Sequence, residues 1–69
     1  MVFVFKTGVK TKQQVKSVTQ KIGYLSEIEY WNFDLEDIDN ILRVESNQHI
    51  ARDIIKMMDE LNIYCFELV

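Results

Sequence analysis

The sequence predicts an α+β fold with four strands and two helices, in the order strand, helix, strand, strand, helix, strand. Three observations predict it. Two stretches repeat apolar residues every three or four positions, as amphipathic helices do. Four shorter stretches are rich in β-branched and aromatic residues, as strands are. Each helical stretch lies between two strand-like stretches, so the chain contains two strand-helix-strand units.

The first strand and the first helix are expected at residues 2–6 and 11–22. The strand reads VFVF and is too short for a helix. Thr11 and Gln14 form a capping-box pattern, in which the Thr11 hydroxyl accepts from the Gln14 amide and the Gln14 side chain accepts from the Thr11 amide. Gly23 follows where a left-handed helix end is expected. The apolar stripe of this helix is Val15, Val18 and Ile22.

The next two strands are expected at residues 29–35 and 41–45, joined by an acidic turn at 36–40. No Asn-Gly or Asp-Gly pair fixes the type of this turn. Both strands alternate, which is typical of a sheet with one buried face. On one face lie Trp31, Phe33, Leu35, Leu42 and Val44, and on the other Tyr30, Asn32, Asp34, Ile41 and Arg43.

The second helix is expected to be capped by Ser46 or Asn47 and to end at Asn62, and residues 63–69 are expected to form the last strand. The apolar positions of this helix are Ile50, Ile54, Met57, Met58 and Leu61. Right-handed crossovers then place both helices on one face of an antiparallel sheet. This is a ferredoxin-like βαββαβ sandwich, with expected strand order 4-1-3-2.

Length and composition indicate a single domain spanning residues 1–69, without linkers or low-complexity tracts. The apolar run at the N-terminus stops at Lys6, which is too short for a signal-peptide core or a membrane span. The one cysteine cannot form an internal disulfide. We therefore expect a cytoplasmic protein that does not insert into a membrane.

Charge is unevenly distributed. Residues 1–24 contain five lysines and no acid, whereas residues 25–69 contain three bases and eleven acids, and the net charge is -3. Such a dipole can orient protein partners or favour head-to-tail self-contact. The alternative is that the lysines simply form a solvated helix face.

Residues 8–18, GVKTKQQVKSV, resemble the metal-binding loop of heavy-metal-associated (HMA) domains, the family of copper chaperones and of modules in metal-pumping ATPases. That family carries G-M-T-C-x-x-C-V-x-x-V at this junction. Gly8 and the two valines match, and Val9 replaces the methionine. The resemblance implies the same fold and strand order along the whole chain. It also implies a degenerate metal site, because Thr11 and Gln14 stand where the metal-ligating cysteines would be.

No metal and no cofactor is expected at this loop. Soft Cu(I) and Zn(II) sites use thiolates, and a Thr hydroxyl and a Gln amide supply neither the charge nor the softness. Cys65 and His49 are other candidate ligands, but they lie on separate elements, and a strand Cys is typically a small buried hydrophobe. The acids of residues 34–39 lack the spacing of a calcium loop.

Neither catalysis nor nucleic-acid binding is expected. His49 is the one histidine, and no Ser or Cys is placed by a motif for activation by it. RNA recognition modules share this element order and stack bases on sheet aromatics. This chain is acidic, however, and lacks the aromatic RNP-type strings of those modules.

A protein-interaction or self-association role is favoured by the side of the sheet that no helix covers. If Phe3 and Phe5 face the helices, an apolar patch lies on the open side. Its members would be Val2, Val4, Tyr30, Ile41, Tyr64, Phe66 and Leu68. The facing of the first and last strands stays open, because both are apolar on both parities. The candidate contact residues are Lys10, Lys12, Lys16, Tyr30, Tyr64 and Phe66.

Two other functions remain as alternatives. An ACT-like small-molecule sensor would bind an anionic ligand at Gly8 and the first helix amides, aided by Lys10 and Lys12. The capping box argues against this, because it occupies the same amides. A metal chaperone with non-standard ligands would depend on Cys65. The sequence identifies neither the partner nor the pathway.

Overall fold

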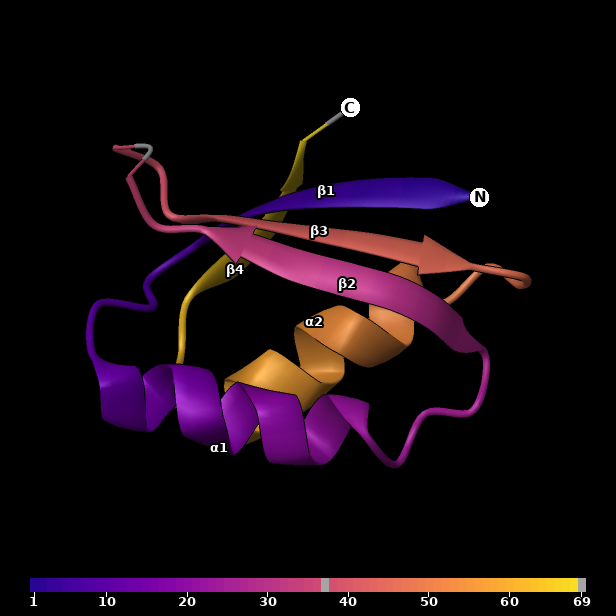
Figure 1. The fold of residues 1–69 in the computed structure, drawn as a ribbon, viewed down its shortest axis with the longest axis horizontal. Coiled ribbons are helices and arrows are strands. Elements are labelled where there is room, and N and C mark those ends of the chain that lie inside the picture. Colours follow the sequence, from indigo (N-terminus) through magenta and orange to yellow (C-terminus); the bar gives the residue numbers. More distant parts are fainter. Residues whose placement is uncertain (37, 69) are drawn as a thin grey trace.

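The fold is an antiparallel four-stranded sheet with two helices on one face (Figure 1). It is seen in a computed structural model that describes residues 1–36 and 38–68. The elements are β1 (Val2–Thr7), α1 (Lys12–Ile22), β2 (Ile28–Asp34), β3 (Ile41–Ser46), α2 (Ala51–Glu60) and β4 (Cys65–Leu68). The predicted βαββαβ sandwich is confirmed.

The strands lie in the order β2-β3-β1-β4, which is the predicted order 4-1-3-2 read from the other edge. All three strand pairs are antiparallel, and β1 and β3 form the centre of the sheet. In register, Phe5 pairs with Leu42 and Phe3 pairs with Val44. Phe33 and Trp31 continue these two rows on β2. Directly paired residues share a face, so this register places the aromatic and aliphatic side chains together.

The core lies between the sheet and the helices, and it settles how the first strand faces. Phe3 and Phe5 are buried with Leu42 and Val44, whereas Val2 is exposed. The odd-numbered residues of β1 therefore face the helices. On the C-terminal segment Ile63 is buried and Cys65 packs against the core, while Tyr64, Phe66 and Leu68 are exposed. From the helices the core receives Val18, Ile22, Ile54, Met57 and Met58.

Three of the four helix-end signals expected from the sequence concern the two ends of α1 and the end of α2. Thr11 caps α1 with both hydrogen bonds of the capping box, as predicted. Asn62 has φ 59°, so it ends α2 in the left-handed conformation, also as predicted. The expectation for Gly23 is wrong, because Gly23 has φ -59° and ψ -18°. The chain continues in tight turns there, with Tyr24 donating to the carbonyl of Lys21 and Leu25 to that of Ile22.

The start of α2 also differs from the expectation, because neither Ser46 nor Asn47 caps it. The N-cap is Ile50, without a side-chain cap bond. Ser46 is the last residue of β3 and is fully buried. Its hydroxyl donates to the carbonyl of Gln48 at 2.7 Å and accepts from the Gln48 amide at 3.0 Å. Serine here closes a turn after a strand, a use that competes with helix capping.

Two strands have different bounds from those predicted. β2 begins at Ile28 and ends at Asp34, so Leu35 lies beyond it and is exposed, not inward-facing. β4 begins only at Cys65, because the amide of Ile63 donates to the carbonyl of Met58 and closes the end of α2. The last residue of the expected strand, Val69, lies outside the described residues.

The adjacent residues Ile54 and Ile55 provide a matched test of this core. Ile54 is 0 % exposed and Ile55 is 36 % exposed. We expect Ile54→Val to lower the free energy of unfolding by about 1 kcal/mol, because it removes a buried methylene, and Ile55→Val to change it by less than about 0.5 kcal/mol. Urea denaturation followed by circular dichroism measures both. Equal effects would show that α2 does not pack as described.

Candidate functional site

The loop between β1 and α1 is held at both ends. The amide of Gly8 donates to the carbonyl of Tyr64 at 2.8 Å, which ties the loop to the segment before β4. A Cβ on Gly8 would lie 3.2 Å from the Cβ of Tyr64, so this close approach favours glycine. Val9 is fully buried, and its amide donates to the Thr7 hydroxyl at 3.3 Å. The loop is therefore a packed part of the fold.

Thr11 and Gln14, which the sequence resemblance places at metal-ligand positions, are engaged with the backbone. The Gln14 side-chain oxygen accepts from the amide of Lys10 at 2.7 Å and from that of Thr11 at 3.1 Å. The Thr11 hydroxyl accepts from the Gln14 amide at 3.1 Å. Every amide from residue 8 to residue 11 thus donates within the protein. An anion at this loop would have to displace these bonds, which is the argument that the capping box provides against a sensor site.

Cys65, the one thiol, lies across from Thr7 on the helix-facing side of the sheet and is partly buried. Burial, together with the charge of Glu67, raises the pKa of Cys65 to about 11. The thiol is therefore protonated at neutral pH, whereas metal ligands and nucleophiles are thiolates. Among the described residues, no three His, Cys, Asp or Glu side chains are grouped so as to hold a metal ion.

His49 lies on the connection between β3 and α2, away from the β1–α1 loop in the sequence. Its ring packs edge-on against Phe3, with the ring centroids 5.5 Å apart and the planes at 65°. The structure therefore gives His49 an aromatic contact at the edge of the core. Within the described residues, neither His49 nor Cys65 belongs to a group of three or more His, Cys, Asp or Glu side chains that could hold a metal ion.

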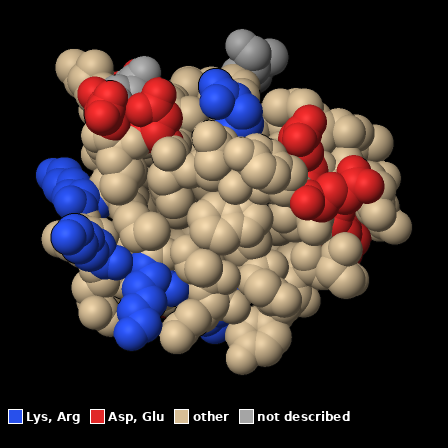
Figure 2. Space-filling model, viewed as in Figure 1, with Lys and Arg blue, Asp and Glu red and all other residues tan. Residues whose placement is uncertain are grey.

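The three candidate lysines Lys10, Lys12 and Lys16 are all exposed. Figure 2 shows positive side chains gathered over the β1–α1 loop and the N-terminal part of α1. Acidic side chains gather over the β2–β3 hairpin and at the opposite end of the molecule (Figure 2). At the hairpin, Lys6 pairs with Asp39 at 3.4 Å. The charge asymmetry of the sequence is thus also an asymmetry in space.

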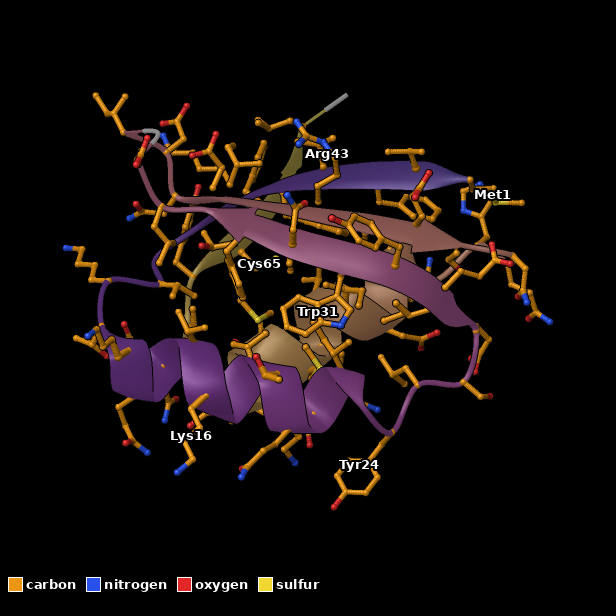
Figure 3. All side chains as sticks on the ribbon, in the orientation of Figure 1. Met1, Lys16, Tyr24, Trp31, Arg43 and Cys65 are labelled. Atoms are coloured by element: carbon orange, nitrogen blue, oxygen red, sulfur yellow. The ribbon has the colours of Figure 1, made fainter. Side chains whose placement is uncertain are left out.

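The uncovered face of the sheet, called here the open face, carries the aromatic candidates. Tyr30, Tyr64 and Phe66 are 55 %, 57 % and 56 % exposed. The apolar patch expected from the sequence is divided, because Arg43 and Glu45 are exposed on the central strand β3 between Tyr30 and β1. The predicted members on β1 and β4 lie together, with Val4 paired with Leu68. Arg43 points away from the helices, whereas Trp31 points into the layer beneath the sheet (Figure 3).

Ile41 also differs from the expectation that it is exposed in the apolar patch of the open face. It is only 8 % exposed, although it does not belong to the core cluster. In register it lies between Lys6 on β1 and Asp34 on β2, which share its face. The long aliphatic part of the lysine side chain can cover such a neighbour while its amine reaches solvent. Ile41 therefore contributes little to a contact surface.

Arg43 and Glu45 are not among the candidate contact residues that the sequence predicts. The alternation of residues 41–45 did place Arg43 opposite the buried Leu42. The register of β3 against both of its neighbours shows that Arg43 and Glu45 separate Tyr30 from β1. A single strand's pattern predicts its own facing, but it does not tell which residues lie beside it.

The strand order and the two helices on one face define an open ferredoxin-like sandwich. A similar solved structure is the yeast copper transporter domain CCC2A, determined in solution in the apo and Cu(I)-loaded states, with a TM-score of 0.83. The match covers 99% of this chain and 94% of that chain at 13% sequence identity. At this identity the likeness shows the fold alone.

No protein-family model matches the chain, and no curated protein matches it in sequence. Nor does any helix among the described residues have the length and apolar character needed to cross a membrane. The features that bear on function are therefore the residues of the loop and of the open face.

The capping box makes a measurable contribution to stability. We expect Thr11→Ala to lower the free energy of unfolding by about 1 kcal/mol, because the Gln14 amide loses its acceptor. Gln13→Ala, on the same turn but outside the box, is the matched control, with an expected change below about 0.5 kcal/mol. Chemical denaturation of both variants measures these changes in the free energy of unfolding. A Thr11→Ala variant as stable as the control would show that the box is not formed in solution.

The raised pKa of Cys65 predicts a slowly reacting thiol. We expect alkylation by iodoacetamide at pH 7 to be much slower than for a free cysteine peptide. The rate should keep rising with pH beyond the ordinary thiol value of 9.0, toward about 11, because only the thiolate reacts. Intact mass spectrometry at timed intervals measures the rate. A plateau near pH 9 would contradict the burial of this side chain.

Proposed function

We propose that this chain is a non-catalytic, metal-free domain with the fold of heavy-metal-associated domains, working as a protein-interaction or self-association module. The observation that carries the proposal is the capping box. The two side chains at the family's ligand positions are neutral, and both are hydrogen-bonded to the backbone at the start of α1. Cu(I) and Zn(II) sites of this kind require thiolates.

The chemistry of the remaining candidate ligands supports the same conclusion. Cys65 is a protonated, partly buried thiol, and the ring of His49 packs on Phe3. A nucleophilic cysteine needs a lowered pKa, so the direction found for Cys65 also argues against covalent catalysis. A metal chaperone dependent on Cys65 would need the same thiolate. The surfaces that remain available are the exposed lysines of the loop and α1 and the open face of the sheet.

The test of metal binding uses native mass spectrometry of reduced protein, alone and with Cu(I) or Zn(II). We expect the protein to stay apo. The double variant Thr11→Cys, Gln14→Cys restores the family's two thiols on the same backbone, and we expect it to take up one Cu(I). Together the two results would show that these positions decide metal binding.

The controls separate the loop from the rest of the chain. Cys65→Ser in the double-cysteine background should leave the new site intact, because Cys65 lies on β4 and is partly buried. Stoichiometric metal uptake by the unaltered protein would overturn the proposal. Loss of that uptake in Cys65→Ser would then identify a chaperone with non-standard ligands.

A further inference from the structure

The open face carries a charge pattern on its central strand that is complementary to itself. Arg43 and Glu45 are two residues apart on β3, and both are exposed on the side away from the helices. Neither has an ion-pair partner among the described residues. Two unpaired opposite charges at the middle of an uncovered sheet suit a contact in which each meets its opposite.

We propose that the open face binds a second copy of this chain, as a two-fold symmetric dimer in which Arg43 of each copy pairs with Glu45 of the other. The inference rests on the proposed function and names its partner. The two-fold axis lies between the two sheets, at right angles to the strands and level with Val44. It reverses the strand direction, so it places position 43 of one β3 over position 45 of the other.

The register shows which residues accompany this pair. Glu45 lies in a row with Tyr30 and Val2, and Arg43 lies in a row with Asn32 and Val4. The axis exchanges these two rows. Val2 of one copy then faces Val4 of the other, and Tyr30 faces Asn32. Apolar and amide groups thus flank the charge pairs on both sides, and no like charges meet in these two rows.

The charges select this symmetry over the alternative. An axis parallel to the strands and passing over β3 would place Arg43 against Arg43 and Glu45 against Glu45, and facing like charges are strongly unfavourable. The paired rows of the open face also hold equal numbers of acids and bases: Lys6, Arg43, Asp34 and Glu45. These rows are therefore neutral although the chain carries -3, so they add no net repulsion between two copies.

The size of the face limits the strength of the contact. Strands about 4.8 Å apart and about six residues long make a four-stranded face of roughly 20 Å in each direction, or about 400 Å² per copy. An axis level with Val44 leaves part of this face uncovered, because β4 pairs with residues 4–7 of β1 and lies to one side of that level. Two copies would therefore bury less than about 800 Å², which is below the ~1,200 Å² of stable specific complexes. We expect a weak dimer, with a dissociation constant on the order of 0.1–1 mM.

The test is sedimentation equilibrium of the full chain over about 10 µM to about 1 mM, a range that brackets the expected dissociation constant. We expect Arg43→Glu or Glu45→Arg alone to weaken association by about tenfold or more, because each creates facing like charges. The double variant Arg43→Glu, Glu45→Arg restores opposite charges and should restore the dimer. Thermal unfolding of each variant verifies the fold, which surface positions leave intact.

Lys56→Glu is the matched control, a charge reversal on the exposed face of α2 that should leave the dimer unchanged, and Lys16→Glu tests the basic helix α1. If Lys16→Glu abolishes association instead, the contact runs head to tail through the basic helix and the inference is wrong. Association that is unchanged by the charge reversals at Arg43 and Glu45, such as pairing along the β4 edge, would also contradict the proposed dimer.

A strictly monomeric protein up to about 1 mM also overturns the dimer. The metal-free assignment would stand in that case, since native mass spectrometry with Cu(I) tests it separately. Conversely, metal uptake by the unaltered protein would refute the proposed function, whatever the oligomeric state of the apo protein.

Discussion

Both helices must cover the same face of the sheet, and this constraint fixes how the two central strands face. Phe3 and Phe5 on β1 pair in register with Val44 and Leu42 on β3, and all four are buried beneath the helices. A shift of one residue in β1 would turn both phenylalanines to solvent. A chain of 69 residues buries only about 60 % of its unfolded surface, so the loss of two aromatic core residues would not be tolerated.

The loop that precedes α1 is ordered by hydrogen bonds and packing within the protein. A metal site contributes its binding free energy to folding only when the ion is bound. Here Val9 is buried, and the Gly8 amide donates to the carbonyl of Tyr64, the residue before β4. Thr11 and Gln14 close the first turn of the helix. The backbone geometry of this junction can therefore persist without metal.

The sequence predicts what depends on local pattern. The alternation of residues 41–45 predicts a strand, and the Thr11–Gln14 pair predicts a helix start. Both are present in the fold. Where a residue type has two uses, pattern was not enough: Ser46 closes a turn after β3, and Gly23 lies in a right-handed turn. The VFVF strand, apolar on both parities, acquires a facing only through its partners in the sheet. The same holds for Arg43 and Glu45, whose place between the aromatics depends on pairing with two other strands.

The charged central strand also limits what the open face can do. A wholly apolar uncovered sheet would stack against any similar surface, which is the usual route to aggregation. Arg43 and Glu45 prevent this, because an apolar partner would leave both charges desolvated and unpaired. A second copy in one orientation satisfies both charges, while the same copy turned by half a turn in the plane of the sheet sets like charges against each other. The polar pair that interrupts the apolar patch thus provides specificity, at the cost of affinity.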